Sequence, residues 1–246
     1  MKTNEEFFDS ISSFYDKMIN FDAAIERRKA ILSNFVDPDM RTAADFGCGT
    51  GLDSIGLSLL GLEVTGFDIS ANMIEQAEIN SKIYNTRIKF VQAELDQISG
   101  YPGEFDLVVS LGNTLANLPS EKLQTALKNS FRMLKPGGRI LLQILHFERI
   151  KSANERIINI TGKDNYFYVR FYDFFEKEIN FNIIKFDSTN TTKREMVTTK
   201  LFIYNPSELQ DILEREGFRN ITLYADLSRK EFNSETSKDL IITAEK

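Results

Sequence analysis

AADFGCGTG at residues 43–51 and GFDIS at residues 66–70 decide the fold of this chain. Each stretch begins as a short apolar run and ends in a polar turn, which predicts two buried strands. The glycines let the backbone turn tightly and let a ligand approach main-chain amides. The carboxylate of Asp68, at the tip of the second strand, can accept both hydroxyls of a ribose. Together the two stretches predict half of a nucleoside-binding site.

Strands and helices alternate outward from these stretches. The pattern predicts strands at 42–46, 63–67, 88–92, 105–110 and 139–145, and helices at 51–60, 71–84 and 120–134. The last helix is expected to stop at KPGG, residues 135–138. Two helices are expected within residues 5–36, with a break near residues 20–22 where Asp22 could cap the second. Strands separated by helices imply parallel pairing and right-handed crossovers. The fold class is therefore α/β, a doubly wound sheet.

The pattern changes at about residue 151, where helical spacing gives way to β-branched and aromatic residues. Strand-like runs are expected at 156–161, 166–175, 179–186 and 196–204, then a helix at 206–216 and strands at 220–224 and 240–244. We interpret residues 1–150 and 205–246 as a nucleoside-binding domain with an N-terminal helical cover. Residues 151–204 are interpreted as a small antiparallel sheet inserted after the fifth strand.

Composition excludes several classes of function. The formal charge of −6 and the pI of about 5.1 argue against a nucleic-acid partner, which needs clustered Lys and Arg. The single cysteine, Cys48, and the single histidine, His146, leave no disulfide framework and no metal site rich in Cys or His. Neither a signal peptide nor an apolar run of membrane-spanning length is visible. We expect a cytoplasmic protein that binds no metal, nucleic acid or membrane.

A dinucleotide fingerprint is the main rival reading of the glycine turn. That fingerprint has Gly-x-Gly-x-x-Gly, with a carboxylate about 20 residues later. Here Leu52 stands where the third dinucleotide glycine belongs, and Asp45 stands before the first glycine, where an apolar residue is usual. Asp68 fits both readings.

The whole set resembles the motifs of the class I S-adenosylmethionine (SAM) dependent methyltransferases. The resemblance covers residues 43–145 and, in outline, the last helix and hairpin. It implies a mostly parallel seven-stranded sheet in the order 3-2-1-4-5-7-6, with strand seven antiparallel and helices on both faces. It also implies SAM as cofactor and S-adenosylhomocysteine as product.

The resemblance assigns the cofactor residues position by position. Asp45 would brace the turn and the methionine amino end of SAM, and Asp68 would bind the ribose hydroxyls. Glu94, with the Leu95 amide beside it, would reach the adenine amino group. The other implied cofactor positions are Gly47, Cys48, Gly49, Gly51, Ile69, Met73 and Leu111. Roles outside cofactor binding remain open for these residues. Either Asp could cap a helix, Glu94 could occupy an exposed loop position, and Cys48 could be an inert small residue.

The acceptor side begins at residues 110–118, SLGNTLANL. This loop lacks the Asp/Asn-Pro-Pro-aromatic signature of amino-methylating DNA enzymes. It is similar instead to the corresponding loop of glycine N-methyltransferase and related small-molecule enzymes. That group has an Arg directly after a His at the end of the fifth strand, whereas His146 here precedes Phe147.

The candidate catalytic residues are Asn113, His146 and Tyr15. His146 could be a general base or make a structural hydrogen bond. Alternation along residues 166–172 puts three tyrosines and Arg170 on one face. That face could recognise a carboxylate or a ring, form a homodimer interface, or belong to a half-exposed strand. One of Arg27 and Arg28 could pair with the SAM carboxylate, or both could be solvated.

These patterns predict a SAM-dependent methyltransferase. The methyl group would pass by in-line displacement to a small-molecule acceptor, with an amine nitrogen favoured. A small-molecule O-methyltransferase and a non-catalytic SAM-binding protein are the alternatives.

Overall fold

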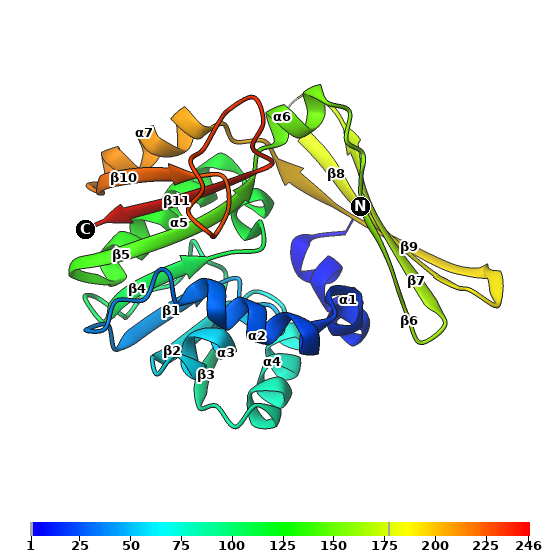
Figure 1. Ribbon diagram of the computed structural model, residues 1–246, viewed down its shortest axis with the longest axis horizontal. Coiled ribbons are helices and arrows are strands. Elements are labelled where there is room, and N and C mark those ends of the chain that lie inside the picture. Colours follow the sequence, from blue (N-terminus) through cyan, green and yellow to red (C-terminus); the bar gives the residue numbers. More distant parts are fainter. Residues whose placement is uncertain (1, 177) are drawn as a thin grey trace.

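The computed structural model describes residues 2–176 and 178–246 of the chain. A seven-stranded sheet carries helices on both faces, and a second sheet of four strands stands at one side of it (Figure 1). The helices are α1 (Asn4–Ile19), α2 (Phe21–Leu32), α3 (Leu52–Leu59), α4 (Ala71–Ile83), the 3₁₀ helix η1 (Thr114–Asn117), α5 (Ser120–Met133), α6 (Phe147–Ser152) and α7 (Pro206–Glu216). The strands are β1 (Thr42–Phe46), β2 (Glu63–Asp68), β3 (Ile88–Gln92), β4 (Phe105–Ser110), β5 (Leu134–Leu145), β6 (Ile157–Lys163), β7 (Tyr166–Phe174), β8 (Glu178–Asp187), β9 (Asn190–Phe202), β10 (Arg219–Tyr224) and β11 (Asp239–Glu245).

The large sheet runs in the order β10-β11-β5-β4-β1-β2-β3. The pairs from β5 to β3 are parallel, and β11 lies antiparallel between β5 and β10. Counted within this sheet alone, the order is 3-2-1-4-5-7-6 with strand seven antiparallel, so the predicted topology is confirmed. The second sheet, β6-β7-β8-β9, is antiparallel and follows β5, as predicted.

Side chains that alternate along the buried strands divide the hydrophobic core between the two faces of the large sheet. Ala43 and Val109 belong to a cluster with α2 and α3, whereas Ala44 and Val108 belong to a cluster with α5 and α7. Successive side chains of a strand point to opposite faces, and here both faces are covered by helices. Small alanines in the central strand β1 let the helices approach closely.

The carboxyl ends of β1, β2 and β4 lie at the same edge of the sheet. The chain leaves β1 toward α3 and β2 on one side, while β4 pairs with β1 on the other. Ligands of open α/β sheets bind at such a switch point.

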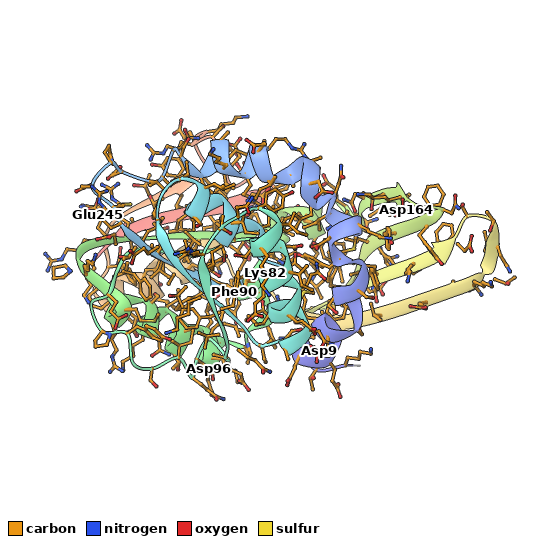
Figure 2. The ribbon with its side chains drawn as sticks, turned by 90° about the horizontal axis from the view of Figure 1, so that it is seen from below. Asp9, Lys82, Phe90, Asp96, Asp164 and Glu245 are labelled. Carbon is orange, nitrogen blue, oxygen red and sulfur yellow. The ribbon has the colours of Figure 1, made fainter. Side chains whose placement is uncertain are left out.

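Helix α1 joins the two sheets. Its apolar face packs against the four-stranded sheet, where Phe14 stacks on Tyr168 with ring centroids 5.4 Å apart. Its other side meets α4: Asp9 Oδ1 accepts a 2.5 Å hydrogen bond from the Ser70 hydroxyl. Figure 2 labels Asp9 on α1 and Asp164 on the turn between β6 and β7. The helix therefore fixes the second sheet relative to the switch point.

Three local expectations are wrong. Asn20, in the left-handed conformation with φ +55°, separates α1 from α2, and Asp22 does not cap α2 but accepts a hydrogen bond from the Tyr84 hydroxyl. Helix α5 ends at Met133, before the KPGG stretch (135–138), as expected, but β5 begins at Leu134 rather than at Arg139, because pairing with β4 begins there and resumes after an irregularity in register. Helix α6 occupies residues for which no helix was expected.

The last strand of the second sheet begins earlier than its apolar run. The fourth was expected from residue 196, but β9 begins at Asn190, because pairing with β8 continues to the turn and holds polar residues extended. No helix in the described ranges is both long enough and apolar enough to cross a bilayer.

Candidate functional site

A cavity of about 750 Å³ opens at the carboxyl edge of the large sheet. Its walls are the turn after β1, the tip of β2, the loops after β3 and β4, helix α1, and strands β6 and β7. Pockets of roughly 300–1,000 Å³ hold drug-sized ligands, so this volume suits a nucleoside cofactor.

The glycine turn after β1 forms one wall. Gly47 and Gly49 have φ of +77° and +53°, and a Cβ at Gly49 would meet no atom within 4 Å. A Cβ at Gly47 would instead collide with the Thr114 side chain, whose Cβ would lie only 2.9 Å away. Gly47 therefore serves close packing, whereas Gly49 leaves its backbone open to the cavity, as a ligand cradle requires. Gly51 is not in the cavity wall; it lies at the start of α3.

Asp68 reaches the cavity from the tip of β2, with 7% of its surface exposed. Its two carboxylate oxygens accept backbone hydrogen bonds from Gly49 at 2.8 Å and Ser70 at 3.0 Å. Burial raises the pKa of Asp68, and the two backbone donors lower it in part. The carboxylate is thus held in one orientation while its free lone pairs can accept ligand hydroxyls.

Asp45 lies beneath the glycine turn rather than in the cavity wall. The Ser54 hydroxyl donates a 2.6 Å hydrogen bond to its Oδ2 atom. Burial and the nearby Asp53 charge raise the pKa of Asp45 well above its ordinary value. Its side chain braces the turn against α3, and the structure does not bring it to the surface that a ligand would touch.

The loop after β3 places acidic groups at the far end of the cavity. Glu94 and Leu95 both line it, and Glu94 is ion-paired with Lys122 of α5. Asp96 also lines the cavity, and its buried Oδ1 atom has no hydrogen-bond partner within the described residues. This orphaned acceptor suits a ligand N–H donor. The sequence reading missed Asp96, although a second carboxylate two positions after Glu94 was a visible signal.

Four further predicted contacts lie in the cavity wall: Cys48, Ile69, Met73 and Leu111. Met73 is fully buried and packs with α1 and the second sheet, so it is a core residue that also reaches the cavity. Burial raises the pKa of the Cys48 thiol well above its usual value, which keeps the thiol protonated and inert.

Arg28 of α2 belongs to the wall near the glycine turn. Its Nε atom lies 2.9 Å from Asp53 Oδ1 on α3. Arg27 is exposed and donates to the Ala23 carbonyl of its own helix. Of the two arginines considered from the sequence, the structure brings Arg28 to the cavity.

The three candidate catalytic residues separate in the structure. Tyr15 of α1 lines the cavity, and burial raises the pKa of its hydroxyl. Asn113 turns its Oδ1 atom to the Leu145 amide at 2.9 Å and is absent from the wall. His146 is only 3% exposed, lies outside the wall, and places Nδ1 3.2 Å from the Ser237 carbonyl, so Nδ1–H is the donor. The position of His146 favours a structural hydrogen bond over a role as general base.

The second sheet turns its Tyr/Arg face toward the large domain. Tyr168 and Tyr172 on this face are buried against α1 and α6, and Arg170 between them lines the cavity. Asn159 and Thr161 of β6 reach the same wall. The sequence reading missed both, because a single polar residue in an alternating strand carries no local signal of a site.

Comparison with known proteins finds methyltransferases among the relatives of this chain. A family model described as a methyltransferase domain matches residues 43–138. The demethylmenaquinone methyltransferase of Lactococcus lactis subsp. lactis is 37% identical over 147 residues, 56% of each chain. The glycine/sarcosine N-methyltransferase of Parasynechococcus marenigrum is 22% identical over 228 residues, 92% of this chain and 80% of the relative.

A similar fold is found in a solved structure. The S-adenosylmethionine-dependent methyltransferase of Clostridium acetobutylicum superposes with a TM-score of 0.80 at 17% identity, over 97% of this chain and 98% of the other. At this identity the likeness concerns the fold. The match to the Lactococcus relative spans little more than half of that protein, so it covers the domain around the glycine turn.

Proposed function

Because the chain belongs to the class I SAM-dependent methyltransferases, we propose that it methylates the amine nitrogen of a small molecule in the cavity described above. The observation that carries the proposal is one cavity of about 750 Å³ whose wall includes both the glycine turn and strands β6 and β7. We name its two parts by their walls. The donor side is the turn after β1, the tip of β2 and the loop after β3; the acceptor side is α1, the loop after β4, and β6 with β7.

The donor side fits SAM. Asp68 would accept the ribose hydroxyls, the open backbone at Gly49 would meet the methionine part, and Arg28 would face its carboxylate. Glu94 and the orphaned Oδ1 atom of Asp96 would take the adenine amino group. When bound, SAM supplies a methyl group on a sulfonium that is already a good leaving group.

The residues of the chain have two tasks in such a transfer: they orient the acceptor and they exclude water. Helix α1 and the second sheet enclose the acceptor side, where the half-buried Tyr15 contributes a hydroxyl. Orientation of the acceptor lone pair along the bond that breaks is the main source of rate in this design.

The nitrogen preference rests on the lack of an imidazole in the described part of the cavity wall, where the titratable acceptors are carboxylates such as Asp53, Glu94 and Asp96. A hydroxyl acceptor needs a base during the transfer, whereas an ammonium can lose its proton to water beforehand and then offers a free lone pair. The chain's single histidine, His146, lies away from the cavity and donates its Nδ1–H to a carbonyl. The described part of the wall thus holds no imidazole, which favours an amine over an alcohol.

Transfer of tritium from methyl-labelled SAM to a panel of small amines and alcohols tests the proposal. We expect labelled product with amines, identified as N-methylated by mass spectrometry. An O-methylated product would support the alternative O-methyltransferase. Tight SAM binding by calorimetry, without label on any acceptor, would instead identify a non-catalytic SAM-binding protein.

A further inference from the structure

Arg170 is the unusual charge of the acceptor side. It lies on β7 between the buried Tyr168 and Tyr172, and its side chain belongs to the cavity wall. Arg170 itself is half-buried, and burial lowers the pKa of its guanidinium. A guanidinium remains charged in proteins, so the second sheet delivers a fixed positive charge into the cavity.

The guanidinium is held in place but left unpaired. Its Nε–H donates a 2.7 Å hydrogen bond to Asn159 Oδ1 on the neighbouring strand. Its two terminal nitrogens make no hydrogen bond to the described residues, and no carboxylate among them lies within 4.0 Å. Asn159 therefore orients a fork of N–H donors that no protein group uses.

The other cations of the cavity wall are neutralised. Arg28 lies 2.9 Å from Asp53, and Lys122 is ion-paired with Glu94. A desolvated charge without a partner is unfavourable, whereas a carboxylate matches the planar fork of an arginine with two parallel hydrogen bonds. Arg170 is thus preorganised for an anion that the chain does not itself provide.

We propose that the methyl acceptor carries a carboxylate and that Arg170, oriented by Asn159, is the residue that binds it. This inference rests on the proposed function, since it identifies the class of acceptor for the same cavity. It makes Arg170 a specificity-determining residue: an amino acid or another amine bearing a carboxylate is preferred over the corresponding neutral amine.

The carboxylate of SAM is the rival partner for Arg170. Arg28 is better placed for that group, because it lies on α2 beside α3, the helix that the glycine turn begins. Asp53 contacts only its Nε atom, and the two terminal nitrogens of Arg28 make no hydrogen bond to the described residues, so they stay available to a carboxylate. Arg170 comes from the part of the wall that the second sheet forms, together with Asn159 and Thr161. The two arginines therefore divide the work, with Arg28 on the donor side and Arg170 on the acceptor side.

The first test uses binding and needs no turnover. The protein is saturated with S-adenosylhomocysteine, and its melting temperature is compared in sodium acetate and in sodium chloride at equal ionic strength. We expect acetate to raise the wild-type value by about 2 °C or more, as a ligand of the folded state does. Arg170→Gln should abolish the rise, whereas Arg194→Gln, at an exposed position of β9, should keep it. An equal rise in Arg170→Gln, or no rise in the wild type, would overturn the proposal.

The second test separates the acceptor from the cofactor. Calorimetry should give Arg170→Gln an affinity for S-adenosylhomocysteine within about twofold of the wild type, since a group that the ligand does not touch contributes little. Loss of about tenfold or more would assign Arg170 to the cofactor carboxylate and reject the acceptor assignment.

Turnover completes the assignment. With glycine and glycinamide as a matched pair of probes, the wild type should favour the carboxylate by about tenfold or more in kcat/KM, and Arg170→Gln should lose that preference mainly through KM. A wild-type preference for the amide would contradict the inference. A protein that responds to acetate through Arg170 but methylates no acceptor would defeat the proposed function and leave the anion site intact.

Discussion

The donor and acceptor sides of the cavity are built in different ways. The donor side collects residues that follow one another at strand ends, such as Gly49 after β1 and Asp68 at the tip of β2. The acceptor side joins Tyr15 of α1 to Arg170 of β7, which are distant in sequence and meet because α1 packs on the second sheet. The first is a local motif on a rigid sheet, whereas the second depends on the docking of two separate elements.

The largest effect is expected on the donor side, from Asp68→Ala. Loss of charge-assisted hydrogen bonds to the ribose should weaken SAM binding by about 3 kcal/mol, roughly a hundredfold. Calorimetry measures it, with circular dichroism as the check on folding. Asp106→Ala is the matched control, because this carboxylate accepts hydrogen bonds from Thr42 and Lys135 at the opposite end of the sheet. Equal loss of affinity in both variants would remove the ribose assignment.

Two glycines of one turn should respond differently to alanine. Gly47→Ala should destabilise the fold by about 2 kcal/mol, because the methyl group collides with Thr114. Gly49→Ala should cost about 1 kcal/mol for its positive φ, but its methyl group would enter the cavity. Denaturant unfolding and SAM titration should therefore rank the two variants in opposite order. The same order in both measurements would mean that the turn acts as a single unit.

Asp45→Asn should change how stability depends on pH. Burial raises the pKa of Asp45 in the folded protein above its unfolded value of about 4. The folded state therefore holds a proton that the unfolded state releases, so wild-type stability should fall as pH rises from about 4 toward the raised value. Asparagine mimics the protonated carboxyl and should remove about 1–2 kcal/mol of that decline. Parallel pH profiles from urea unfolding would contradict this role.

The smallest effect is expected at the rim of the acceptor side. Lys17 of α1 lies 3.0 Å from Asp164, at the tip of the hairpin between β6 and β7, and both side chains are about half exposed. Such pairs contribute roughly 0–1 kcal/mol. Asp164→Asn should therefore lower stability by less than about 0.5 kcal/mol, whereas Phe14→Leu, at the stack on Tyr168, should lower it by about 1 kcal/mol or more. A larger loss from Asp164→Asn would mean that charge, rather than apolar packing, docks the second sheet.

The contrast between the two sides also explains which parts of the fold could be predicted. Alternating apolar runs and glycine turns are local signals, so the positions of β1 to β4 followed from them. The strand order came instead from the resemblance to the class I SAM-dependent methyltransferases. The start of β9 at Asn190 did not, because hydrogen bonds to β8 hold a polar segment extended. For the same reason the sequence did not predict α6, and it placed the KPGG stretch (135–138) outside β5.

The sequence by itself indicated the glycine turn and the carboxylate of Asp68 at the next strand tip, because this motif needs no distant partner to be recognised. Only the tertiary structure decided that Asp45 lies beneath that turn. It also decided that His146 and Asn113 use their polar atoms on backbone groups outside the cavity. Finally, it placed the Arg170 side chain in the cavity wall without an ion-pair partner among the described residues. The physical reason is that a side chain's role depends on which polar atoms remain free after packing. Those partners come from strands and helices far apart in the chain, which no local pattern encodes.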